Sequence, residues 1–194
     1  CPGTPTARTE DVTNPCGPGW TPTSPPTAIY PQNPCTVVDS LLKTNSFPQL
    51  LNNLRDSTPI HHEIGYSFTL PDTSNNTHTY YAGQGSLAVN IDPTSPIDGI
   101  MHNHYDTAGR HLIFSAEDIT YLAQLFVRNE IRDLKTFTFT LVTDSTAYIL
   151  MISDSTKFRN FVNAWLDTDK HMEDFGTIFY DTYNVAGNGL TVAQ

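Results

Sequence analysis

The feature that most constrains the fold is a hydrophobic period that changes several times along the chain. Between residues 37 and 54 apolar side chains recur every three or four positions, with a break at 45–48 that predicts two short helices. From residue 64 the period becomes two, because Ile64, Tyr66 and Phe68 alternate with smaller or polar residues. That alternation is typical of a strand.

The same two periods predict the rest of the elements. We expect strands at 78–81, 86–91, 97–104, 137–142 and 147–152, and helices at 115–127, 155–166 and 172–183. The order is helix, about four strands, helix, two strands, helix. This order favours an α/β (α+β) fold in which helices flank a mixed central sheet.

Residues 1–35 differ in composition from the rest of the chain. They hold 9 of the 14 prolines, with many threonines and glycines, so we expect a linker or tether before a domain at 36–194. A Cys16–Cys35 disulfide and separate thiols both remain open. The cysteine at residue 1 is also what a matured bacterial lipoprotein would show, so a lipid anchor in the bacterial cell envelope, or secretion, is one expectation; an N-terminus cut at an ordinary cysteine is the other.

The charge balance bears on the partners. The formal net charge is −10, with 20 acidic against 10 basic residues. Binding to nucleic acid phosphates or to an anionic membrane surface requires clustered basic residues, so both are disfavoured. No apolar run reaches the roughly 18 residues of a membrane span, so we expect no transmembrane segment.

A candidate metal site lies in the segment His102-Asn103-His104. On a strand, residues i and i+2 share a face, so His102 and His104 present two imidazoles side by side. Asp118 follows near the start of the helix predicted from Ser115, for which Ser115 is a plausible N-cap. Two imidazoles and a carboxylate are a common ligand set of catalytic zinc, with water in the fourth position.

Two further residues would complete a hydrolytic site. Zinc lowers the pKa of a bound water from 15.7 to about 7, and amide hydrolysis then needs a proton-accepting carboxylate and an oxyanion donor. Glu63, at the start of the first predicted strand, is the best candidate for the carboxylate. Its neighbour Gly65 would allow close backbone approach beside the metal strand. Ser115 would lie on the same helix face as Asp118 and is the best candidate for the donor.

The pattern Glu63, His102-Asn103-His104 and Ser115-Ala116-Glu117-Asp118 resembles the signature of the JAMM (MPN-plus, JAB-domain) zinc metalloproteases, in particular their bacterial members. The resemblance covers roughly residues 60–155. It implies a cytidine-deaminase-like fold and a Zn²⁺ ion held by His102, His104 and Asp118. It also implies that Glu63 is the general base, that Ser115 assists the oxyanion, and that a protein or peptide substrate is cleaved at a peptide or isopeptide bond.

Two departures from that signature keep other hypotheses open. Ten residues separate His104 from Ser115 where the family usually has seven, and Tyr105 stands where it usually has proline. These departures motivate a second hypothesis, a non-catalytic MPN-like protein-interaction module. A third is an envelope lipoprotein with a purely structural metal. Barrel hydrolases with His-x-His typically need about 250 residues, and a cytidine deaminase needs cysteine ligands, so both are disfavoured.

Overall fold

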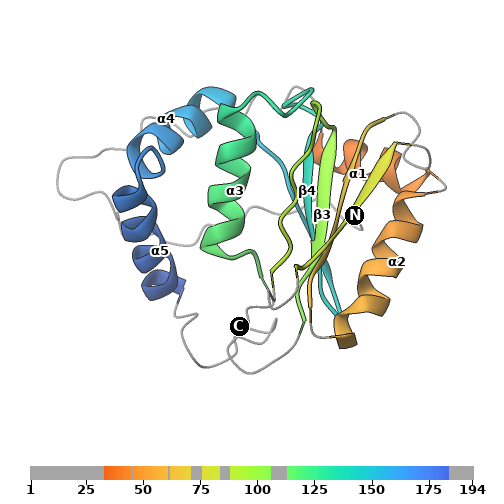
Figure 1. The fold of residues 1–194 in the computed structure, drawn as a ribbon. Coiled ribbons are helices and arrows are strands. Elements are labelled where there is room, and N and C mark those ends of the chain that lie inside the picture. The colour runs from red at the N-terminus through yellow and green to blue at the C-terminus, as the bar shows by residue number, and fades with distance from the viewer. Residues whose placement is uncertain are drawn as a thin grey trace, which may run out of the picture.

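The computed structural model describes residues 33–44, 46–60, 62–70, 76–83, 88–105 and 113–183. They form a five-stranded sheet with helices on both faces, as Figure 1 shows, which confirms the predicted mixed α/β class. The elements in chain order are α1 (Pro34–Leu42), α2 (Phe47–Ser57), a 3-10 turn (Thr58–Ile60), β1 (Ile64–Phe68), β2 (Thr77–Tyr81), β3 (Gly99–Asn103), α3 (Ala116–Val127), β4 (Thr138–Val142), β5 (Ala147–Leu150), α4 (Ser155–Trp165) and α5 (Asp169–Tyr183).

The first two helices begin at positions that local residues set. The Asn33 side chain caps α1 by accepting the N–H of Cys35, and Pro34 occupies the first turn, where no N–H is needed. Pro48 stands in the first turn of α2 for the same reason. Two short helices were predicted here, and that prediction is confirmed. Within the described residues Cys35 forms no disulfide, and Cys1 and Cys16 lie outside them, so the predicted Cys16–Cys35 pairing is not tested.

The strand order is β2-β1-β3-β4-β5. β1 is antiparallel to both β2 and β3, β4 is antiparallel to β5, and β3 and β4 are parallel. Parallel neighbours need a crossover connection, and α3 lies in the connection between β3 and β4. The chain therefore passes from the carboxyl end of β3 to the start of α3, which is where the candidate site forms.

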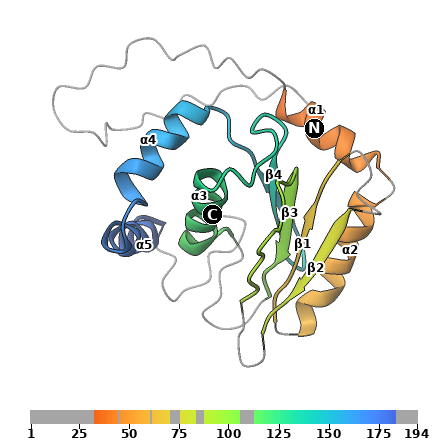
Figure 2. The same cartoon turned by 45° about the horizontal axis from the view of Figure 1, so that its top comes forward.

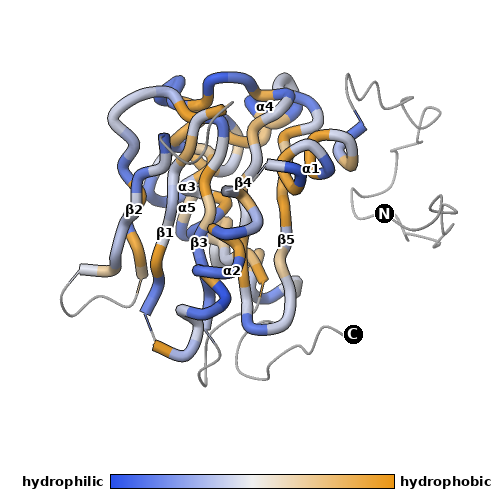
Figure 3. The backbone as a smooth tube through the Cα atoms, turned by 90° about the vertical axis from the view of Figure 1, so that its right-hand side faces the viewer, coloured by the Kyte–Doolittle hydropathy of each residue, from blue (hydrophilic) through white to orange (hydrophobic). Residues whose placement is uncertain are grey.

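The two faces of the sheet carry separate cores. α1 and α2 cover one face, whereas α3 covers the other with α4 and α5 outside it (Figure 2). The first core comprises Val37, Leu41, Phe47, Leu50, Leu54, Ile64, Tyr66, Phe68, Met101 and Val142. The second comprises Ile91, Ile97, Ile100, Leu122, Leu125, Phe126, Phe137, Phe139 and Ile152. Figure 3 shows long hydrophobic stretches along the central strands and a mostly hydrophilic β2 at the edge.

One predicted strand is wrong. The segment 88–91 belongs to no strand, and residues 86 and 87 lie outside the described part of the chain. Its backbone forms hydrogen bonds with side chains rather than with a neighbouring strand. The Val89 N–H donates to the Glu63 carboxylate, and the Ile91 carbonyl accepts from the Tyr121 hydroxyl. The segment thus lines the site instead of extending the sheet.

Candidate metal centre

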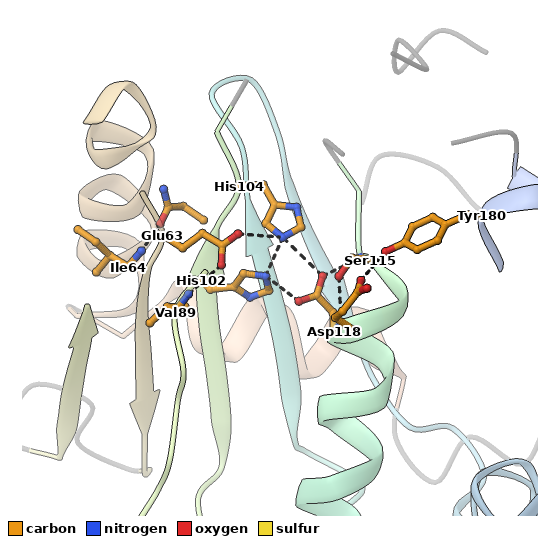
Figure 4. Close-up of polar contacts among 10 residues, drawn as sticks. Glu63, Ile64, Val89, His102, His104, Ser115, Asp118 and Tyr180 are labelled. Atoms are coloured by element: carbon orange, nitrogen blue, oxygen red, sulfur yellow. Dashed lines mark hydrogen bonds and ion pairs between the residues drawn. The ribbon is translucent and has the colours of Figure 1, made fainter. Parts of the chain in front are cut away.

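The two histidines project from the carboxyl end of β3 onto the face that α3 covers. His102 is 3% exposed and His104 8% exposed, and their Nε2 atoms lie 3.1 Å apart (Figure 4). β1 runs alongside, with Gly65 paired to His102. A Cβ on Gly65 would lie 2.5 Å from Cδ1 of Ile91, so glycine lets that side chain pack beside the histidine strand.

Asp118 approaches the histidines from the first turn of α3. Ser115 caps this helix, since its Oγ accepts the Asp118 N–H at 3.1 Å while Asp118 Oδ2 accepts the Ser115 N–H at 2.7 Å. This reciprocal capping box holds the carboxylate with Oδ1 3.1 Å from Nε2 of His102. The other oxygen, Oδ2, lies 3.5 Å from Nε2 of His104.

These separations match the size of a metal ion. Bonds of about 2.0–2.1 Å in a tetrahedral site place neighbouring ligand atoms about 3.3–3.4 Å apart. The two Nε2 atoms lie 3.1 Å apart, Asp118 Oδ1 lies 3.1 Å from that of His102, and Asp118 Oδ2 lies 3.5 Å from that of His104. Among the described residues, His102, His104 and Asp118 form a group whose ligand atoms all lie within 4.8 Å of one another. The group could therefore hold a metal ion.

The pKa values of His102 and Asp118 depend strongly on each other. Burial lowers the pKa of His102, but the adjacent carboxylates, chiefly Asp118 and then Glu63, more than offset this, and the net pKa is raised. Burial raises the pKa of Asp118, but the two histidines and the Ser115 N–H outweigh it and hold that pKa well below its usual range. Asp118 is thus ionised at neutral pH, as a metal ligand must be.

Glu63 lies on the same side of the sheet as the histidines. It immediately precedes β1 and is 6% exposed. Its Oε2 accepts the Val89 N–H at 3.0 Å, and its Oε1 lies 3.8 Å from Nε2 of His104. The carboxylate is therefore beside the three candidate ligands without belonging to their group. All five residues singled out in the sequence thus come together in space.

A cavity of about 410 Å³ opens onto this group. Its walls include Glu63, His102, His104, Ser115 and Asp118. The walls also include Glu117 and Tyr180, which the sequence had not singled out, and the Tyr180 hydroxyl donates to the Glu117 carboxylate (Figure 4). Glu117 lies inside the Ser-x-x-Asp segment, so the sequence could have indicated that it lies near the site. Tyr180 comes from α5, and no local pattern marks it.

The comparisons with known proteins identify no relative of this chain. No protein-family model, no curated protein and no solved structure matches this chain. The cytidine-deaminase-like fold therefore stays a prediction. None of the helices that the structure describes combines the length and the apolar composition that a bilayer crossing requires.

Proposed function

We propose that this protein is a zinc-dependent peptidase or isopeptidase of the JAMM type. The observation that carries the proposal is the convergence of His102, His104 and Asp118 at metal-ligand separations, with the Glu63 carboxylate beside them and a cavity in front. A site with three protein ligands leaves a coordination position for water, which is the arrangement of catalytic zinc.

The donor set favours zinc among the common metals. Two imidazole nitrogens and one carboxylate oxygen suit zinc, whereas magnesium and calcium prefer oxygen ligands alone. A zinc ion in this position would supply Lewis-acid chemistry and a water made nucleophilic at neutral pH. A protein or peptide amide bond would enter through the cavity.

Each side chain then has a role that follows from its place. Glu63 accepts the proton of the attacking water and delivers it to the leaving amine. The Val89 N–H bond to Oε2 leaves Oε1 pointing toward His104, on the side where the reaction takes place. Ser115 donates a hydrogen bond from its hydroxyl to the oxyanion, because its Oγ accepts the Asp118 N–H and its O–H is left to act as the donor.

The test combines metal analysis with hydrolysis. Protein purified with zinc is assayed against a mixed library of linear peptides and of peptides joined through a lysine side chain, with products read by mass spectrometry. We expect one bound zinc, loss of zinc in His104→Ala, and retained zinc in Glu63→Gln with at least about a 100-fold slower rate. His171→Ala is the matched control, since His171 is a half-exposed histidine on α5 paired with Asp167.

Two results would contradict the proposal. Wild-type protein that binds no zinc would remove the metal site, and a Glu63→Gln variant as active as wild type would remove the base. Zinc binding without any hydrolysis would instead support a non-catalytic MPN-like module. The sequence departures at Tyr105 and in the loop after His104 motivate that alternative; residues 106–112 of this loop lie outside the described part.

A further inference from the structure

Asn103 is the middle residue of the His-Asn-His segment, and the proposed chemistry gives it no role. Because side chains alternate along β3, Asn103 faces away from the two histidines, toward the core under α1 and α2. It is fully buried there at 0% exposure. Met101, two residues earlier on the same face, belongs to that apolar core.

Asn103 makes one specific contact with the neighbouring strand. Its Oδ1 accepts the backbone N–H of Ile64 at 2.6 Å. The β1–β3 pairing ends at Gly65 opposite His102, so this side chain carries the connection between the strands one residue further. The contact therefore joins the histidine strand to the point where β1 begins, directly after Glu63.

The Ile64 N–H belongs to the peptide group whose carbonyl is that of Glu63. That carbonyl accepts the Ala82 N–H at 3.1 Å. The peptide group is planar, and both of its polar atoms are engaged: the oxygen toward the end of β2 and the N–H toward Asn103. These two hydrogen bonds fix the orientation of the peptide group. The Glu63 side chain is attached directly next to it, on the Glu63 Cα (Figure 4).

The orientation of the Asn103 amide follows from the same contact. An N–H donor requires an oxygen acceptor, so Oδ1 must face Ile64 and Nδ2 must face away. Nδ2 is buried and has no hydrogen-bond partner among the described residues. Burying an unpaired donor is unfavourable, so the Nδ2 group gives no reason for an amide here. The bond accepted by Oδ1 is the reason that remains.

We propose that Asn103 is a positioning residue that fixes the Glu63 carboxylate relative to the His102–His104 pair. It acts through the Glu63–Ile64 peptide group and touches neither metal nor substrate. The role in catalysis rests on the proposed function, because it takes Glu63 as the base. The positioning itself can be measured without any hydrolysis.

The experiment measures amide hydrogen exchange by NMR in wild type, Asn103→Leu and Asn103→Asp. Val89 is the reporter, because its N–H donates to Glu63 Oε2 rather than to Asn103. In Asn103→Leu we expect the Ile64 and Val89 amides to exchange at least about tenfold faster, as the loss of one buried hydrogen bond predicts. Asn103→Asp keeps an acceptor oxygen and should exchange more slowly than Asn103→Leu at both amides, although burial of its carboxyl group lowers the overall stability.

Controls separate positioning from general loosening. Leu125 in the α3 core reports global opening and should keep its wild-type rate. Thr140→Val removes a different fully buried polar group, the hydroxyl at the strand position paired with Met101, and should leave the Val89 rate unchanged. If Asn103→Leu does not fold, Asn103→Ala takes its place. An unchanged Val89 rate in a folded variant would overturn the proposal.

A kinetic cycle then tests the consequence for catalysis. Asn103→Leu should lower kcat at least about tenfold with little change in KM when Glu63 is present, and should have almost no effect in the Glu63→Gln background. Equal effects in both backgrounds would overturn the positioning role. Absence of all hydrolysis would count against the proposed function instead, while the exchange result would still decide whether Asn103 positions Glu63.

Discussion

The two faces of the sheet differ most at the carboxyl end of β3. On the α1/α2 face Met101 and Val142 continue an apolar core. On the α3 face the apolar core reaches Ile100 and Phe139, and the next inward side chain of β3 is His102, at the cavity. Consecutive residues of one strand therefore contribute to packing on one side and to a polar site on the other.

The difference teaches where buried polar groups can be tolerated. The α3 face has the start of a helix beside the strand end, and the free N–H groups and positive dipole end of that helix favour the Asp118 carboxylate. On the α1/α2 face the polar Asn103 side chain is paired instead through one hydrogen bond, which its oxygen accepts from the Ile64 N–H. Removing a side chain should thus have different consequences on the two faces.

The largest effect is expected on the apolar face. Phe47 is fully buried and packs edge-on against Phe68, with 5.8 Å between ring centroids. Phe47→Ala should lower the free energy of unfolding by about 3–5 kcal/mol, because it removes apolar contact and leaves a cavity. Urea unfolding measures this. Zinc stoichiometry of the folded variant should stay at the wild-type value; a loss of zinc would show that the faces are not separable.

The next largest effect is the response to zinc. At a free zinc concentration 100 times the dissociation constant, binding should stabilise the wild type by about 2.7 kcal/mol. His104→Ala should show a much smaller gain, and Phe47→Ala should show the full one. Thermal unfolding with and without zinc provides the measurement. Equal stabilisation of wild type and His104→Ala would place the metal elsewhere.

Ser115 should show a smaller effect, with two separable parts. Ser115→Ala removes the helix cap and should lower the free energy of unfolding by about 1 kcal/mol. Ser115→Asn restores a capping oxygen but provides no hydroxyl, so it should recover stability without recovering the rate of hydrolysis. Chemical unfolding and the peptide assay, run on the same three proteins, measure the two parts. Full activity in Ser115→Asn would exclude the hydroxyl as the oxyanion donor.

The smallest effect is expected for Tyr180→Phe. The lost hydroxyl donates to Glu117, which is exposed and can bond to water instead. The free energy of unfolding should change by no more than about 0.5 kcal/mol. The zinc dissociation constant, measured by competition with a chelator, should stay unchanged. A tenfold weaker zinc affinity would show that α5 supports the metal group.

Most of the fold was predictable because each element carries its own period. The two short N-terminal helices, the helix capped by Ser115 and the hairpin of β4 and β5 all appear where the sequence predicted them. The failure at 88–91 has a physical cause. An apolar, alternating segment looks like a strand, but whether it pairs depends on which partner is beside it, and here Glu63 and Tyr121 engage its backbone.

The sequence by itself determined the residues that depend on local geometry. Strand alternation puts His102 and His104 on one face, and helix capping puts Ser115 and Asp118 together. Only the tertiary structure decided what lies across strands: Glu63 beside His104, Asn103 against Ile64, and Tyr180 at the cavity wall. The physical reason is the separation along the sequence. A local period follows from the backbone of one segment, whereas these contacts depend on how separate segments pack.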